Sequence, residues 1–370
     1  MIYLDNNATT LLDSEVLDAM HPFLRSITGN ASSVHRLGQQ AKGALTAATR
    51  QCARFFNVRP DEIIFTSGAT EALNLVIRSV PKNAHVITST LEHAAVLEPL
   101  KLAGCQVSYL SPEKGQGAVT LAQVKGALQP HTRMIILTAA NNETGVKTDY
   151  VPLATLAEQL SIPFVLDGVA LLGKEPLLLP KGVWAACFSG HKIHGPLGIG
   201  IALIRKTHPA DPLIVGGAQQ RNLRAGTENL PAIVGFAKAL DLLSQHGEKW
   251  AHQMVQLRDY FEKQLSIAIP DLLIHGHDQP RLCNTSHIAF PGVDGETLLM
   301  TLDLAGLACS HGAACSSGTL EPSRVLLNMG ITPALARSSL RFSLSRFTTR
   351  AEIEAAVQLI TEATHRLRAL

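Results

Sequence analysis

The sequence lacks several features that would point to a membrane, a secretory route or nucleic acid. No run approaches the ~20 apolar residues that a membrane-spanning helix needs. The first residues, MIYLDNNATT, contain no basic segment followed by an apolar stretch, as a secretory signal would. No run of Lys and Arg exceeds two residues, and the formal net charge is +2, which argues against direct binding to nucleic acid or a membrane surface. We therefore expect a cytoplasmic protein that acts on small molecules.

Cysteine is also scarce, with six residues scattered over 370. A secreted disulfide scaffold is usually shorter and denser in cysteine, so these residues are interpreted as reduced thiols. The chain has no CxxC pair and no zinc-like spacing. His191 and His194 bracket Lys192, but no thiolate or carboxylate lies near them in the sequence to complete a metal site. We expect no bound metal.

Hydrophobic residues make up 46% of the chain, enough for a large buried core, and the length suggests two domains. Short apolar runs at 63–65, 85–89, 134–138 and 164–167 alternate with helical patterns such as 72–80 and 151–160. Strands that are apolar on both faces and alternate with helices predict a parallel sheet covered on both sides. A helical pattern over 231–268, as one helix or as two joined near Gly247, then leads into a smaller α+β region.

Polar residues follow several of the predicted strands, where ligands bind in parallel α/β sheets. In FTSGATEALN (65–74), Ala69 and Thr70 would open a helix whose backbone N–H groups suit a phosphate, although an ordinary helix cap explains the segment equally simply. His93 follows a second strand, where a lone histidine is more often structural. Asn142 lies in what could be a simple turn. Asp167 ends an apolar strand and would either cap the next helix or meet a buried cation.

The segment CFSGHKIHGPLGIG (187–200) places Ser189, His191 and Lys192 after another strand, in a stretch rich in glycine. A desolvated lysine is the kind that forms a covalent bond with a carbonyl cofactor. An exposed loop lysine is the simpler alternative.

The segment ACSHGAACSSGTLEPS (308–323) surrounds Cys315 with Gly312, Gly318 and four serines. Buried structural cysteines rarely have such neighbours, and reactive cysteines are accessible ones whose pKa allows a thiolate. Cys315 is therefore a candidate nucleophile, with an ordinary surface loop as the alternative. Cys309, closer to an apolar run, is expected to be structural.

Taken together, these segments resemble the cysteine desulfurase family, which belongs to the class-V aminotransferase group of fold-type-I pyridoxal-phosphate enzymes. The resemblance spans essentially the whole chain. The order and spacing of the matching pieces make chance agreement implausible. They are YLDNNATT, GNASSVHRLG, FTSGATEALN, EHAAV, NNETG, FSGHKIHGPLGIG, LRAGTEN, CSHGAACSSGTLEPS and LRFSLSRFTT.

The resemblance implies an α/β fold. A large domain, 15–249, would carry a mostly parallel seven-stranded sheet and bind the cofactor. A small α+β domain, 1–14 and 250–370, would carry the catalytic cysteine. It also implies a homodimer, because Thr227 would reach the cofactor phosphate of the partner subunit.

The resemblance assigns roles to the matching positions. Lys192 would hold pyridoxal 5′-phosphate covalently, Asp167 would pair with its ring nitrogen, and His93 would stack on the ring and move protons. Cys315 would take sulfur from L-cysteine, leaving L-alanine and a persulfide that passes to an acceptor, such as an iron–sulfur scaffold protein, or serves tRNA thiolation. The remaining roles are phosphate binding by Ala69, Thr70, Ser189 and His191, and substrate-carboxylate binding by Asn142 and Arg341.

Two departures from the family pattern stand in DGVALLGK (167–174). Ala170 replaces a glutamine that would hydrogen-bond the phenolic oxygen of the cofactor, and Gly168 replaces the usual alanine. A third, Ala31 for proline in GNAS, is minor. Two rival functions stay open, the second of them because of Ala170. One is another pyridoxal-phosphate reaction on an amino acid, such as that of a selenocysteine lyase, β-lyase or transaminase. The other is a weakly active or degenerate homologue.

Overall fold

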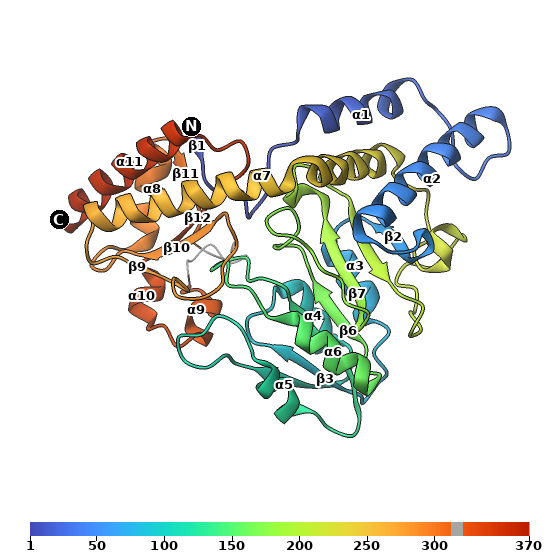
Figure 1. The fold of residues 1–370 in the computed structure, drawn as a ribbon, viewed down its shortest axis with the longest axis horizontal. Helices are drawn as coiled ribbons and strands as arrows, with labels where there is room; N and C mark the ends of the chain where they lie inside the picture. Colours follow the sequence, from blue (N-terminus) through green and yellow to red (C-terminus); the bar gives the residue numbers. More distant parts are fainter. Residues whose placement is uncertain (312–320, 370) are drawn as a thin grey trace.

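The larger part of the molecule is built on a seven-stranded sheet (Figure 1). The computed structural model describes residues 1–311 and 321–369. The strand order is β2-β8-β7-β6-β5-β3-β4; pairing is parallel from β7 to β4, whereas β8 runs antiparallel to both of its neighbours. The predicted mostly parallel sheet is therefore present. Its strands are β2 Ile63–Thr66, β3 His85–Ser89, β4 Gln106–Leu110, β5 Thr132–Thr138, β6 Phe164–Asp167, β7 Val183–Ser189 and β8 Gly200–Ile204.

Alternation of side chains along each strand divides the core of this part into two layers. In β6, Phe164 and Leu166 join one buried cluster and Val165 joins the other; in β5, Ile135 and Met134 are separated in the same way. Both faces of the sheet are thus covered, which is why the strands appear in the sequence as continuous apolar runs. The covering helices are α2 Arg36–Phe56, α3 Ala69–Ile77, α4 Ala94–Leu102, α5 Leu121–Ala127 and α6 Tyr150–Leu160. Short 3₁₀ turns lie at η1 Pro60–Glu62, η2 Gly190–Lys192 and η3 Gln219–Asn222.

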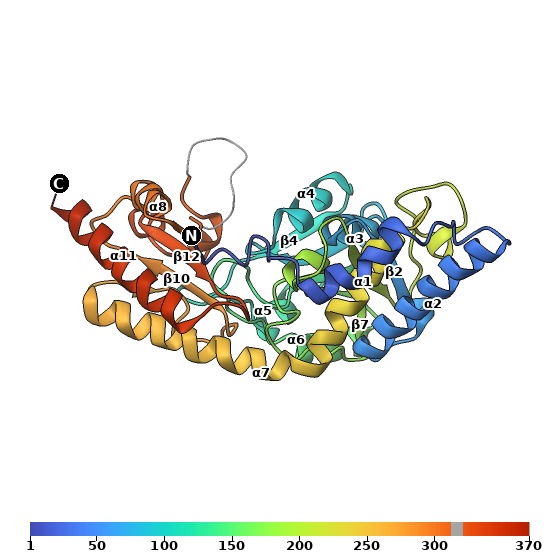
Figure 2. The same cartoon turned by 90° about the horizontal axis from the view of Figure 1, so that it is seen from above.

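One helix connects the two parts of the molecule (Figure 2). Helix α7, Leu230–Ala268, is continuous over 39 residues, so the alternative of two helices joined near Gly247 is wrong. Its first half packs on the sheet through residues such as Phe236 and Leu240 and contacts α1 Ser14–Arg25 and α2. Its second half contributes Phe261 and Leu265 to a separate core. We therefore propose that the boundary between the domains falls within this helix, at 249/250.

The second core holds the smaller α+β part. The antiparallel sheet β12-β10-β9 packs its apolar face against the end of α7 and the last helix. The N-terminus joins this part, because β1 pairs in parallel with β11 and Asp5 bridges to Ser343. The elements are β1 Ile2–Tyr3, β9 Leu273–Ile274, β10 Thr285–Ala289, β11 Leu307–Ala308, β12 Ser339–Ser343, α8 Gly295–Leu304, α9 Arg324–Asn328, α10 Pro333–Arg337 and α11 Arg350–Arg368. None of the helices in the described residues is long and apolar enough to cross a membrane.

A buried ion pair fastens α7 to this small sheet. Arg281 donates from both terminal nitrogens to Glu262, at 2.7 and 2.9 Å, and Ser286 Oγ donates to the same carboxylate at 2.7 Å. Both charged side chains are buried. Removing one partner of such a pair leaves an uncompensated charge in the interior, which is more costly than losing an exposed pair.

We predict that Glu262→Ala lowers the free energy of unfolding by about 3–5 kcal/mol, because Arg281 is left buried and unpaired. Urea unfolding followed by circular dichroism measures the change. The matched control is Glu98→Ala, which breaks an exposed pair with Lys101 of the same 2.7 Å length and should change stability little. Equal stability of the two variants would contradict the assigned role of the pair.

Candidate active site

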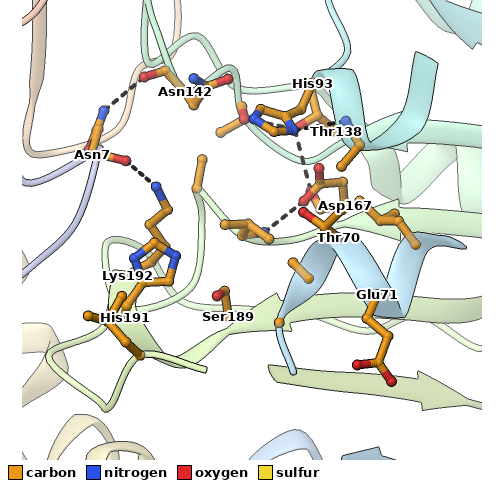
Figure 3. Close-up of a pocket in the computed structure, with 18 of the residues that line it drawn as sticks. Asn7, Thr70, Glu71, His93, Thr138, Asn142, Asp167, Ser189, His191 and Lys192 are labelled. Carbon is orange, nitrogen blue, oxygen red and sulfur yellow. Dashed lines mark hydrogen bonds between the residues drawn. The ribbon is translucent and has the colours of Figure 1, made fainter. Parts of the chain in front are cut away.

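A cavity of about 450 Å³ opens at the carboxyl ends of the sheet strands, where the sequence predicted a site. Figure 3 shows Lys192 and Asn7 on one side of this space, with Thr70, His93 and Asp167 on the other. Side chains from the sheet domain and from the N-terminal segment meet here. The predicted site residues that line the cavity are Ala69, Thr70, His93, Asn142, Asp167, Ser189, His191 and Lys192.

Lys192 extends into the cavity from the turn after β7. Its Nζ donates to the backbone oxygens of Asn7, at 2.5 Å, and Ala8, at 2.8 Å. Burial, together with the nearby cations Arg341 and Lys174, lowers the pKa of this amine from 10.5 to about 8, while Asp5 and Asp167 oppose the shift. A lysine near neutrality, held by carbonyls that a ligand could replace, is suited to act as a nucleophilic amine.

Asp167 stands at the end of β6, buried to 5% exposure. Burial raises the pKa of its carboxyl, whereas a hydrogen bond from the Val169 backbone N–H (3.0 Å) and the nearby His93 lower it. A buried carboxylate is costly without a cationic partner. The cavity wall therefore presents a group that favours a positively charged ligand atom.

His93 caps helix α4, since its Nδ1 accepts a hydrogen bond from the Ala95 backbone N–H at 3.0 Å. This contact leaves Nε2 as the proton-bearing nitrogen of the neutral ring. Burial lowers the pKa of His93, although Asp167 raises it. The structural and functional interpretations of this residue therefore both apply: the same imidazole caps a helix and lines the cavity.

The cavity wall at the start of helix α3 is suited to an anion. Helix α3 begins at Ala69 after the cap residue Gly68, so its first backbone N–H groups lie at the cavity wall with the Thr70 hydroxyl. Ser189 and His191 lie close by (Figure 3). Burial, together with Lys192 and Lys174, lowers the pKa of His191 to about 4, so its ring is neutral at physiological pH.

Two of the predicted site residues that the structure describes, Arg341 and Thr227, do not line the cavity. Arg341 in β12 lies behind it, with Nη1 donating to the Asn142 backbone oxygen (3.2 Å) and Nη2 to Asp5 Oδ1 (2.7 Å). Thr227 is exposed and is not among the described residues at the cavity wall. Cys315 lies outside the described residues, so its role stays a prediction. Cys309 is half-buried against the core of the small domain, and burial raises the pKa of its thiol.

The structure adds two residues, Asn7 and Lys174, for which the sequence analysis assigned no role. Asn7 lines the cavity, and its side chain donates to Asn142 O (3.0 Å) and Thr285 Oγ1 (2.9 Å). Lys174 is buried and donates from Nζ to the Lys192 backbone oxygen at 2.6 Å; burial lowers its pKa to about 8. Asn7 lies in YLDNNATT and Lys174 in DGVALLGK, two segments compared with the family pattern, and this was the only sequence feature that could have pointed to them.

The two departures from the family pattern have different structural contexts. At Gly168 a Cβ atom would lie 2.3 Å from Cε1 of Phe188, so the packed ring accounts for glycine here. Ala170 lines the cavity, and its methyl group offers no hydrogen bond to a ligand.

Comparison with known proteins shows the family to which this chain is similar. The family model of class-V aminotransferases matches residues 2–356. The chain is 41% identical over its full length, and over 94% of the relative, to cysteine desulfurase 2 of Trichormus variabilis. It is 39% identical to cysteine desulfurase IscS of Dictyoglomus turgidum, again over all of this chain and 96% of the relative.

Solved structures agree. A NifS-like protein superposes with a TM-score of 0.91 at 33% identity, covering 99% of this chain and all of the other. The structure described as SspA in complex with cysteine superposes with a TM-score of 0.82 at 30% identity, covering 94% of this chain and all of the other. The chain belongs to the class-V aminotransferase family. Within it, the relatives named above are cysteine desulfurases, so the resemblance drawn from the sequence motifs is confirmed.

The position of Lys174 predicts that it helps to lower the pKa of Lys192. Without bound ligand, Lys192 should become reactive to reductive methylation as the pH rises through about 8, rather than near 10.5. Lys174→Met removes a neighbouring cation and should move this profile to higher pH. Mass spectrometry of the Lys192 peptide measures the reaction, and Lys101→Met, at an exposed lysine, is the control. An unchanged profile in Lys174→Met would show that the two amines are not coupled.

Proposed function

We propose that this protein is a pyridoxal-phosphate-dependent cysteine desulfurase, which converts L-cysteine to L-alanine and passes the sulfur to an acceptor. The observation that carries the proposal is the placement of Lys192 across one cavity from Asp167, in a chain aligned end to end with relatives of that name. The cavity provides an amine of lowered pKa, a buried carboxylate and an anion-binding helix terminus, all from separate strand ends.

These groups fit pyridoxal phosphate by their chemistry. Lys192 would hold the aldehyde carbon, Asp167 would pair with the protonated ring nitrogen, and His93 would lie against the ring. The phosphate would occupy the start of α3 with Thr70, Ser189 and His191. When bound, the cofactor supplies an electron sink next to the substrate's α-carbon. The penalty for burying Asp167 would then be offset by a cationic partner.

The protein's own residues would do the remaining work. The neutral amine of Lys192, once released from the cofactor, can take a proton at Nζ, and Asn7 and Ala8 fix its position through their backbone oxygens. His93, neutral with its proton on Nε2, can transfer a proton at the cavity wall. Asn142 and Arg341 would bind the substrate carboxylate. The Cys315 thiolate would attack the substrate sulfur, forming an S–S bond as the Cβ–S bond of the substrate breaks. The substrate carbon would keep the electron pair of that bond and gain a proton to give L-alanine, and Cys315 would be left as a persulfide.

We further propose a homodimer. Thr227, which would reach the phosphate of the partner subunit, is exposed in this chain, and the cavity-lining Leu197 is 72% exposed. An apolar side chain left open at a cavity is suited to contact with a second subunit. The acceptor, such as an iron–sulfur scaffold protein, would receive the sulfur from Cys315. We propose that this reaction takes place in the cytoplasm.

The proposed function is tested by assaying the purified protein with L-cysteine. We expect a yellow protein, equal amounts of alanine and sulfide in the presence of a thiol reductant, and borohydride fixation of the cofactor to the Lys192 peptide. Cys315→Ala should keep the colour and lose persulfide formation, while Cys309→Ala, matched in residue type, should keep activity. Loss in Cys309→Ala alone would identify the other thiol. Production of pyruvate, or activity only with selenocysteine, would favour one of the rival lyases.

Because Ala170 offers no hydrogen bond, we predict that this protein binds the cofactor less tightly than a variant with glutamine at this position. Ala170→Gln restores a donor for the phenolic oxygen, and a hydrogen bond to a charged group contributes about 1.5–3 kcal/mol. The dissociation constant for pyridoxal phosphate, measured by equilibrium dialysis, should therefore fall by roughly tenfold or more. Ala170→Leu, which adds bulk without a donor, is the control. Equal affinity of wild type and Ala170→Gln would show that position 170 is neutral in this chain.

A further inference from the structure

The guanidinium of Arg341 already has a carboxylate partner inside the protein. Asp5 Oδ1 accepts from Nη2 at 2.7 Å, with the two side chains 21% and 3% exposed respectively. A second contact, from Nη1 to the Asn142 backbone oxygen, places the same guanidinium against the loop that lines the cavity. The residue proposed to bind an amino-acid carboxylate is therefore neutralised before any substrate arrives.

Within the described residues, Arg341 does not use all of its guanidinium nitrogens. Its Nε is buried and has no hydrogen-bond partner among the described residues. A buried donor left unpaired is costly, and Arg presents its five N–H groups as a planar fork that matches a carboxylate. This unpaired nitrogen indicates that the internal partner does not satisfy the guanidinium fully. The planar fork of Arg341 therefore retains donor capacity for a second oxygen ligand.

The backbone fixes Asp5 in place. Residues on either side of it pair with β12: Ser343 N–H donates to Leu4 O at 2.7 Å, and Asn6 N–H donates to Ser343 O at 3.2 Å. Ser343 is two residues from Arg341 on the same strand. The strand pairing thus holds Asp5 beside Arg341, so the Asp5 carboxylate stays next to the guanidinium.

We infer that Asp5 is an internal competitor for Arg341 and sets the affinity of the site for the substrate carboxylate; this inference rests on the proposed function. A substrate carboxylate that reaches Arg341 comes close to the Asp5 carboxylate, and juxtaposed like charges oppose binding. The guanidinium must then be shared between two anions. Asp5 thereby weakens the binding of every α-carboxylate at this position, substrate and product alike, and leaves ligands without a carboxylate unaffected.

The test is Asp5→Asn in the holoenzyme, because asparagine keeps the oxygen that accepts from Nη2 and removes only the negative charge. We expect the KM for L-cysteine and the inhibition constant of L-alanine each to fall about tenfold, with kcat little changed. Inhibition by cysteamine, which has the thiol and amine but no carboxylate, should stay the same. Asp5→Glu, which keeps the charge, should not gain affinity for L-alanine.

The matched control is Asp259→Asn, which removes an aspartate paired with Arg258 at the same 2.7 Å on the surface and should leave all constants unchanged. A raised or unchanged inhibition constant for L-alanine in Asp5→Asn would overturn the inference, since Asp5 would then only hold Arg341 in position. An equal gain for cysteamine would also overturn it. If Asp5→Asn does not fold, Asp5→Ser is measured in the same way.

The failure of the proposed function would give a different result. In that case wild-type protein would form no alanine from L-cysteine. Calorimetric titration of L-alanine into wild type and Asp5→Asn would still decide whether Asp5 opposes carboxylate binding, because that measurement requires no turnover.

Discussion

The site depends on the docking of one extended N-terminal segment between the two domains. Thr10 pairs with the turn that carries Lys192, through its backbone N–H to His191 O (2.9 Å) and its hydroxyl to the same oxygen (2.8 Å). A few residues earlier, Asn7 accepts from Asn284 Nδ2 (3.0 Å) and donates to Thr285 in the small domain. The segment therefore satisfies buried polar groups of both domains at once. It also supplies the carbonyls that hold the Lys192 amine and the carboxylate that holds Arg341.

This arrangement explains why two cations can stand near one another in a buried cavity. Lys192 and Lys174 have lowered pKa values because desolvation disfavours their charged forms, and each lies within reach of another cation. The N-terminal segment places the backbone oxygens of Asn7 and Ala8 against Lys192, with Asp5 nearby, and the backbone oxygen of Lys192 in turn accepts from Lys174. A ligand with negative charge at one end and a positive ring atom at the other complements the site.

The sequence predicted the central strands well because their chemistry is local. Strands β3 and β6 have the predicted bounds, since buried parallel strands are short apolar runs. Strand β4 was not predicted, because this edge strand is partly exposed and alternates polar residues such as Gln106 and Ser108. The sequence also predicted that the polar residues at the strand ends lie close together, because the carboxyl ends of parallel strands share one edge of the sheet. Asp5 and Lys174 could not be assigned roles, because their importance comes from contacts with residues far away in the sequence.

The continuity of α7 has a mechanical consequence. A helix of 39 residues is about 58 Å long at 1.5 Å per residue, and it enters both cores without an intervening loop. Hinges usually lie in loops or at the ends of elements, where a few dihedral angles absorb the motion. Helix α7 passes from one domain to the other without a loop, so a relative rotation of the domains must bend this hydrogen-bonded helix. The continuous helix thus holds the two domains in a fixed relative orientation. Small conformational changes around a ligand are therefore left to side chains and to the loops at the strand ends.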